Sequence, residues 1–212
     1  MFRHLAMDRL WSHDESMEIR VLPSPFCWSQ AGRIPLQEIC HDWHGRSIAP
    51  PAGFALLEDP VHLWLLACRE SPANAHPAGD CGDFQAGLWK YDVAELFIAP
   101  AGGEGYLEFN LSPRGTWWVE RFCAPRQLNA LDALPGVVTH ACAPGLGAWQ
   151  AALGIPLGWL REEVAWGDGA RANVNFILES PQQLFLSACD LGGGEPDFHR
   201  PSAFARLRRL GG

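Results

Sequence analysis

The chain has 212 residues, ten tryptophans and a formal net charge of −8 at pH 7. This length fits one large β domain, which should bury roughly 70% of the surface that the unfolded chain exposes. The negative charge argues against nonspecific nucleic-acid binding, which depends on clustered Lys and Arg. We interpret the single basic cluster, residues 206–209, as a solvated turn at the C-terminus.

Cysteine usage indicates a reducing compartment. The sequence has seven cysteines and no Cys-x-x-Cys pair, so it contains neither a zinc ribbon nor a thioredoxin-like motif. Charged residues interrupt the first twenty positions, and no apolar core of a secretory signal is seen. No stretch reaches the ~18 uncharged apolar residues of a membrane span. We therefore expect a cytoplasmic protein that does not contact a membrane.

Short apolar or alternating runs, separated by Pro and Gly, recur along the whole chain. In chain order they are residues 18–22, 34–40, 53–57, 61–68, 93–98, 106–111, 116–122, 137–142, 172–178 and 183–189. Many short strands with turn residues between them predict a β-sandwich or a barrel. No composition break or internal repeat is visible, so we expect one domain over residues 1–212.

Two hairpins and one helical turn are predicted within this pattern. Residues 106–111 alternate cleanly, the segment Ser-Pro-Arg-Gly at 112–115 favours a turn, and a β-rich run resumes at Thr116. A second hairpin is expected around residues 180–182. A short helix is expected near residues 157–163, where Pro156 favours a helix start. We predict an all-β, two-sheet antiparallel sandwich with one or two short helical turns.

Several segments resemble one family of binding modules. Residues 89–98, Trp-Lys-Tyr-Asp-Val-Ala-Glu-Leu-Phe-Ile, are similar to a characteristic strand of family 9-like carbohydrate-binding modules in the DOMON-like superfamily. Further similar blocks are Tyr-Leu-Glu-Phe-Asn at 106–110 with Gly-Thr at 115–116, Ile-Pro at 155–156, Arg-Ala-Asn at 171–173, and Phe-His-Arg-Pro at 198–201. These blocks keep the family's order from about residue 50 to the C-terminus.

The resemblance implies a jelly-roll-like sandwich and a sugar ligand. In sugar-binding members, a tryptophan and a glutamate six residues later clamp the sugar, and here these positions are Trp89 and Glu95. An indole offers a large flat surface for a pyranose ring, and a carboxylate accepts hydrogen bonds from hydroxyls. The residues themselves leave a plainer alternative open, in which Trp89 caps a loop and Glu95 makes a structural hydrogen bond.

The rest of the expected site comes from the C-terminal third. The family's second clamp aromatic is missing, because Ala-Cys-Asp stands at residues 188–190. Phe198 or His199 is the expected substitute. Arg171, Asn173 and Arg200 are the expected polar walls of the site; their alternative role is to tie loops to the sheet.

Other tryptophans are expected in structural roles. Trp64 lies in a wholly apolar run and is expected in the core. Trp117 and Trp118 are adjacent on a strand and must face opposite sides, so one of them is expected to be buried.

No metal or cofactor is expected, although calcium and haem stay open as alternatives. Residues 40–44, Cys-His-Asp-Trp-His, group ligand types without a second cluster that would complete a zinc site. Calcium occurs in some family members, but no Asp-rich loop identifies ligands here. Haem would need His62, His140 or His199 as axial ligand, since all three methionines lie at the N-terminus.

Catalysis is the remaining alternative. Glycoside hydrolysis needs two carboxyl groups that flank the scissile bond, and Glu95 and Glu108 lie on successive predicted strands. No sequence motif of a nucleophilic hydrolase, metalloprotease or nucleotide-binding enzyme is present. We expect a non-catalytic domain with a small carbohydrate as ligand, associated with a glycoside hydrolase if it has a protein partner.

Overall fold

The computed structural model describes residues 16–103, 105–145 and 147–211. The first fifteen residues, on which most of the expectation of no secretory signal rests, lie outside the described residues. Every strand region expected from the sequence contains a strand. Their bounds are β1 (Ser16–Val21), β2 (Gln37–His41), β3 (Ser47–Glu58), β4 (His62–Arg69), β5 (Val93–Ala99), β6 (Tyr106–Leu111), β7 (Trp117–Ala124), β8 (Gln127–Asn129), β9 (Val138–Gly145), β10 (Ala148–Pro156), β11 (Arg171–Leu178), β12 (Leu184–Ser187) and β13 (Ala205–Leu210).

Among the described residues, helical structure is confined to short segments. They are the 3₁₀ turns η1 (Trp28–Arg33), η2 (Leu88–Lys90) and η3 (Pro201–Ala203), and the helix α1 (Leu157–Val164). The helix follows Pro156, as the sequence predicts. No helix in the described part of the chain is long and apolar enough to cross a membrane.

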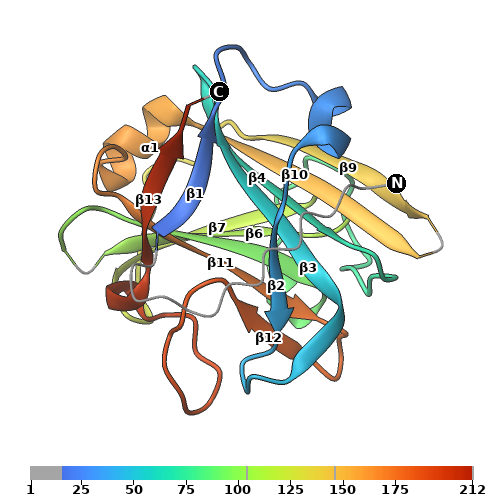
Figure 1. The fold of residues 1–212 in the computed structure, drawn as a ribbon. Helices are drawn as coiled ribbons and strands as arrows, with labels where there is room; N and C mark the ends of the chain where they lie inside the picture. The colour runs from blue at the N-terminus through green and yellow to red at the C-terminus, as the bar shows by residue number, and fades with distance from the viewer. Residues whose placement is uncertain (1–15, 104, 146, 212) are drawn as a thin grey trace.

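The strands form two packed layers. Hydrogen bonds link them in the order β8-β7-β6-β5-β11-β13-β1-β3-β4-β10-β9, with β12 beside β11 and β2 beside β3. In Figure 1, β3, β4 and β10 cross in front of the layer that holds β6, β7 and β11. Rings from the two layers meet: Trp149 of β10 and Phe176 of β11 have centroids 6.3 Å apart. The core lies between these layers, and the all-β sandwich is confirmed.

Pairing at the chain ends differs from a purely antiparallel sandwich. Strand β1 runs parallel to β13 on one side and to β3 on the other, and these strands connect the two layers (Figure 1). The strands β1 and β13 come from opposite ends of the chain, so no hairpin imposes an antiparallel direction on them.

The prediction of a solvated turn at residues 206–209 is wrong, because this segment lies in β13. The alternation of inward and outward positions in β13 cannot be seen in the sequence, because arginines occupy both kinds of position. Arg206 and Arg208 are exposed, whereas Arg209 turns inward and is neutralised by Glu58, with 3.1 Å between Nη2 and Oε2. A paired charge can occupy a half-buried strand position that an unpaired charge would avoid.

Two further strands, β8 and β10, were not expected from the sequence. Strand β10 is rich in Ala and Gly, which are depleted in strands and give no strand signal. It nevertheless lies inside the sheet, between β4 and β9. Its Gly154 is required by packing, because a Cβ there would lie 2.7 Å from the Trp64 ring.

The predicted local features are confirmed. Strands β6 and β7 form the first hairpin, in which Gly115 has a φ of +83° and Ser112 N–H donates to Thr116 O at 2.9 Å. Strands β11 and β12 form the second. Trp64 and Trp117 are buried, and Trp118 is only partly covered. All seven cysteines are free thiols.

Candidate functional site

A row of polar side chains crosses five neighbouring strands. Strand register places Trp118 of β7 opposite Asn110 of β6, Asn110 opposite Glu95 of β5, Glu95 opposite Asn175 of β11, and Asn175 opposite Ser187 of β12. Residues directly opposite each other in a ladder project from the same face of the sheet. We call these five side chains the polar row.

The polar row faces away from the second layer. Alternate positions on the same strands carry apolar side chains, among them Leu96, Phe109, Val119 and Val174, which are buried in the core. Successive residues of a strand point to opposite faces. The face that carries the polar row is covered by loops, and Phe84 stacks on Trp118 with ring centroids 4.3 Å apart.

Several atoms of the polar row are buried without a partner. Asn110 and Asn175 are fully buried, and Glu95 is 3% exposed. Within the described residues, Glu95 Oε2, Asn110 Oδ1, Asn175 Nδ2 and Trp118 Nε1 have no hydrogen-bond partner. Each such group costs about 1–3 kcal/mol, and buried polar groups are nearly always paired. Four of the eight such atoms among the described residues lie in this one row, which makes it the candidate place for a ligand or water that completes the missing hydrogen bonds.

Two carboxyl groups on this face have raised pKa values. Burial, together with the nearby charge of Glu108, raises the pKa of Glu95 well above its ordinary value. Burial also raises the pKa of Glu108 to about 7, although Asn110 Nδ2 donates to Glu108 Oε1 at 2.8 Å. The proximity of Glu120 acts in the same direction on Glu108. Protons are therefore held on this face close to neutral pH.

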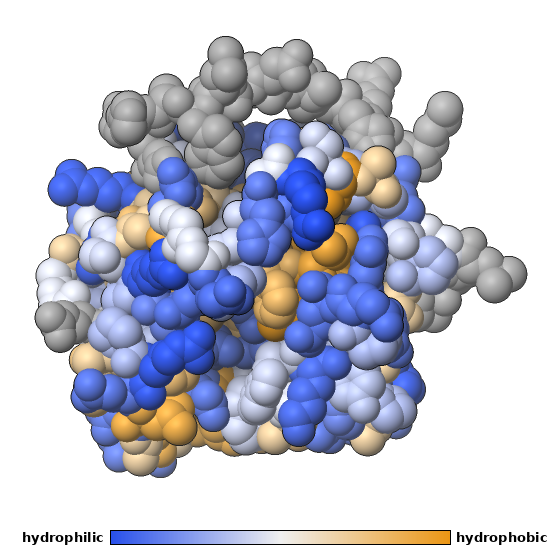
Figure 2. Space-filling model, turned by 90° about the horizontal axis from the view of Figure 1, so that it is seen from below, coloured by the Kyte–Doolittle hydropathy of each residue, from blue (hydrophilic) through white to orange (hydrophobic). Residues whose placement is uncertain are grey.

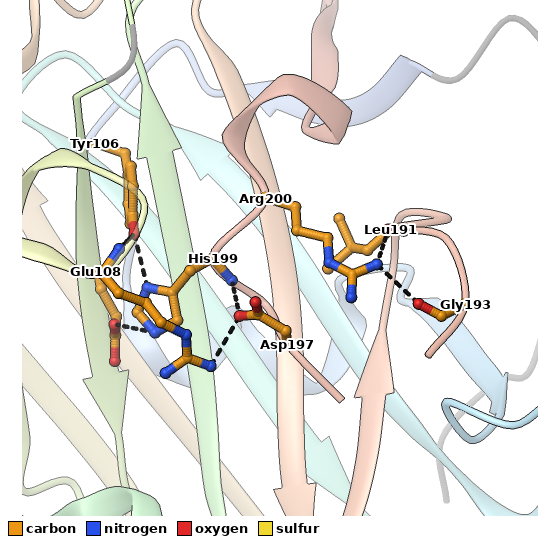
Figure 3. A network of polar contacts seen from close by, with 8 residues as sticks. Tyr106, Glu108, Leu191, Gly193, Asp197, His199 and Arg200 are labelled. Carbon is orange, nitrogen blue, oxygen red and sulfur yellow. Dashed lines mark hydrogen bonds and ion pairs between the residues drawn. The ribbon is translucent and has the colours of Figure 1, made fainter. Parts of the chain in front are cut away.

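His199 lies beside Glu108 on the same face (Figure 3). Tyr106 Oη accepts from the backbone N–H of Arg126 at 3.2 Å and shares a hydrogen bond with His199 Nδ1, 2.7 Å away. The other ring nitrogen, Nε2, lies 3.8 Å from Glu108 Oε2. Burial lowers the pKa of His199 to about 4. His199 is therefore an uncharged neighbour of the carboxyl pair.

The structure brings some of the expected wall residues to the polar row and not others. Asn173 lies beside the row and donates to Asn175 Oδ1 at 2.7 Å. Arg171 donates to Pro201 O at 2.9 Å. Arg200 donates to Leu191 O at 2.7 Å, and Figure 3 shows it pointing away from His199.

These contacts favour the alternative role of both arginines, which is to tie loops to the sheet. Phe198 is buried and packs against Trp43, with ring centroids 5.8 Å apart. It therefore presents no free ring face comparable to that of an exposed indole.

Trp89 remains accessible. It lies in η2, just before β5, and is 40% exposed. Its carbonyl accepts from Gln183 Nε2 at 2.8 Å. Gln183 also lines a pocket of about 220 Å³, together with Trp43 and Phe185. Viewed from below, the molecule is mostly hydrophilic, with a strip of hydrophobic surface in a hollow between polar residues (Figure 2).

The described residues offer no group of three or more His, Cys, Asp or Glu side chains that could hold a metal ion. In the segment 40–44, Asp42 accepts from Arg46 Nε at 2.7 Å and from the backbone of His44 at 3.0 Å. His140, one of the residues considered for haem, stacks on Trp28 and Trp64, with centroids 5.4 and 5.9 Å apart.

Four members of the candidate site were not expected from the sequence: Asn110, Asn175, Trp118 and Ser187. The sequence nevertheless carries a signal for them in two strands. Polar residues recur at every second position of otherwise apolar runs, at Glu108 and Asn110 and again at Asn173 and Asn175. Such alternation in a fully buried strand indicates a polar face that is covered rather than solvated.

Known structures share this fold. A Bacteroides uniformis protein with the provisional name of a carbohydrate-binding protein superposes with a TM-score of 0.69, at 20% identity over 92% of this chain and 99% of its own. A family 9 carbohydrate-binding module from Caldicellulosiruptor kristjanssonii in complex with glucose gives a TM-score of 0.59, at 15% identity over 92% and 97% of the two chains. The same organism's module in complex with cellotriose gives 0.58, at 13% identity over 92% and 95%.

These comparisons establish the class of fold. The chain has the fold of family 9 carbohydrate-binding modules. Neither a protein-family model nor a curated protein matches the sequence.

Proposed function

We propose that the chain is a non-catalytic carbohydrate-binding domain whose ligand is held by the polar row, with Trp89 as stacking surface at the rim. The observation that carries this proposal is the set of buried, unpartnered atoms on one face of β5, β6, β7 and β11. Ordered water bound in place of a ligand is the competing explanation for these atoms, and the binding experiment below decides between them.

Sugar hydroxyls match this set of atoms. Glu95 Oε2 and Asn110 Oδ1 are acceptors, or a donor and an acceptor when Glu95 is protonated, whereas Asn175 Nδ2 and Trp118 Nε1 are donors. A hydroxyl both donates and accepts, so the hydroxyls of a sugar ligand can serve donors and acceptors alike. Modules of the same fold bind glucose and cellotriose, which supports a small carbohydrate as ligand.

Hydrolysis is the second candidate, because Glu95 and Glu108 are neighbouring carboxyl groups whose pKa values are both raised. Both carboxyl groups are buried, and Glu108 is engaged by Asn110. We rank binding first, because modules of the same fold bind glucose and cellotriose. Turnover of a chromogenic glycoside that Glu95→Gln abolishes would reverse this order. A glycoside hydrolase is the protein partner that a binding domain of this kind would serve.

The site is tested by titration calorimetry with glucose and cellotriose on the wild-type chain and on Trp89→Ala. Loss of one aromatic stacking surface, worth about 1.5 kcal/mol, should weaken binding roughly ten-fold. The melting temperature should not change, because Trp89 is exposed and its hydrogen bond to Gln183 uses the backbone carbonyl.

Leu128→Ala, at a side chain that is 65% exposed, serves as the control and should bind like wild type. Undiminished affinity of Trp89→Ala would show that the indole is not part of the site. Absence of binding across a wider panel of sugars by the wild-type chain would reject the proposed function.

A further inference from the structure

The face that carries the polar row is acidic at its centre. Glu108 lies directly opposite Glu120 and one position diagonal from Glu95, so three adjacent strands each contribute a carboxyl group to the same side. Among the ion pairs of the described residues, Glu95 and Glu120 have no cationic partner, and Glu108 has the neutral His199.

Nearby cations are already committed. Arg126 pairs with Asp197 at 2.9 Å, and its side chain is 62% exposed at the rim. Arg171 and Arg200 donate to loop carbonyls. The remaining neighbours of Glu95 across the strands are the amides of Asn110 and Asn175. Arg126 acts on Glu108 from the rim, where its positive charge lowers the Glu108 pKa, but no cation among the described residues forms an ion pair with Glu95 or Glu120.

A buried carboxylate without a cationic partner is unfavourable, and here the protein holds protons on the pair instead. The cluster is nevertheless more than a group of acids on a surface. Glu95 Oε2 and Asn110 Oδ1 are buried, unpartnered and on the same side of the sheet. With Glu95 ionised, both atoms are acceptors, so the site is arranged for a group that brings several donors.

We infer that the ligand of this site carries an ammonium group, and that amino sugars bind in preference to neutral sugars of the same shape. This inference rests on the proposed carbohydrate-binding function and specifies its ligand class. An ammonium group has three N–H donors and no acceptor, which matches Glu95 Oε2, Asn110 Oδ1 and a carboxylate oxygen of Glu108.

The energetic argument concerns protonation. A neutral sugar leaves the carboxyl pair holding its protons, whereas an ammonium group allows the carboxylates to ionise and to form charge-assisted hydrogen bonds, which are roughly twice as strong as neutral ones. His199 does not oppose this, because it is uncharged at neutral pH. Binding of an amine should therefore release protons from the protein.

The test compares three trisaccharides by titration calorimetry on the full chain at pH 6.5: chitotriose with free amines, its N-acetylated form and cellotriose. These ligands differ at the sugar 2-position and share the β-1,4 linkage. We expect chitotriose to bind at least ten-fold more tightly than cellotriose. Titrations in two buffers of different ionisation enthalpy should detect proton release with chitotriose and none with cellotriose.

Substitutions test whether the preference for chitotriose depends on Glu95 and Glu108. Glu95→Gln and Glu108→Gln should each reduce the preference for chitotriose over cellotriose to within about three-fold and abolish proton release. Glu162→Gln, at an exposed position of α1, removes the same charge elsewhere and should leave the preference intact. Circular dichroism verifies that each variant is folded.

The possible results separate the two proposals. If cellotriose binds as tightly as chitotriose, the inference is overturned while the carbohydrate-binding function stands. If the preference for chitotriose persists in both glutamine variants, it reflects attraction to the negative protein as a whole, and the inference is again wrong. If no sugar in this or a wider panel binds, the proposed function and the inference fail together.

Discussion

Adjacent residues of one strand have opposite roles in this protein. Trp117 is buried and donates through Nε1 to Gly82 O at 3.0 Å, so its polar atom is satisfied within the chain. Trp118 points to the other face, where its Nε1 has no partner among the described residues. One indole therefore serves the structure, and the other has a donor to offer to a ligand.

The two tryptophans predict opposite effects of the same substitution. Trp118→Phe keeps the stack on Phe84 and removes a buried donor that has no partner, so stability should not fall, while affinity for a bound sugar falls about two- to ten-fold, the value of one hydrogen bond. Trp117→Phe should leave affinity unchanged and lower the free energy of unfolding by about 1–3 kcal/mol, through a lost hydrogen bond and a cavity.

Urea unfolding and titration calorimetry on both variants measure these effects. A loss of affinity with Trp117→Phe and none with Trp118→Phe would show that the ligand binds on the face of the sheet opposite to the polar row, and would contradict the proposed site.

At the scale of an element, strand β6 shows how alternation divides one strand between two purposes. Leu107, Phe109 and Leu111 pack into the core, whereas Tyr106, Glu108 and Asn110 line the opposite, covered face. The loop that carries His199 lies on this second face through the Tyr106 hydrogen bond. Its titratable groups therefore sit where burial, rather than solvent, sets the pKa.

The raised pKa of Glu108 predicts that the free energy of unfolding depends on pH. Its pKa rises from 4.5 in the unfolded chain to about 7 in the fold, so the folded state binds more protons between these values. Stability from this group is full below pH 4.5 and is lost as pH rises toward 7. Glu108→Gln, which imitates the protonated group, should match wild type at pH 4.5 and exceed it by up to about 3 kcal/mol above pH 7.

Urea titrations at pH 4.5 and 8 provide this comparison, and a difference that does not grow with pH would contradict the burial of an uncompensated carboxyl group. His199 acts in the opposite direction. Its pKa is lowered to about 4, so its contribution is lost as pH falls below 6.5, and the two effects partly cancel in the wild-type chain. The difference between variant and wild type isolates Glu108, because His199 is present in both.

At the scale of the whole molecule, β13 connects the two layers. It pairs antiparallel with β11 of one layer and parallel with β1, which in turn pairs with β3 of the other. Arg209 adds contacts to Glu58 and to the ring of Trp166. Without β13, the edges of β11 and β1 would both lose their ladder partner.

Removal of residues 205–212 should therefore destabilise the chain severely. We expect the melting temperature to fall by more than about 10 °C, which corresponds to a few kcal/mol for a chain of this size, or folding to fail. Removal of Gly211 and Gly212 alone is the control and should have no effect. Thermal unfolding followed by circular dichroism measures both truncations, and a cooperative wild-type transition without β13 would show that the layers hold together by core packing alone.

The fold class and much of the local structure could be predicted from the amino-acid sequence. Alternation and turn residues located the hairpin around Gly115, since both signals depend on residues close together in the chain. Glu95 could be identified as a site candidate because a charged residue in an apolar strand is conspicuous and because the surrounding residues resemble a known strand. Strand β10 escaped detection because its small residues have no strand preference of their own and are held by their neighbours.

Which polar side chains become neighbours depends on the tertiary structure and could not be predicted from the sequence. Alternation within a strand shows which residues share a face, but the alignment of β5 with β11 joins segments about eighty residues apart and is set by packing of the whole core. That alignment places Asn175 beside Glu95. It also decided that Arg171 and Arg200 bind loop carbonyls, because the partner of a long flexible side chain depends on which backbone groups the folded loops bring within its reach.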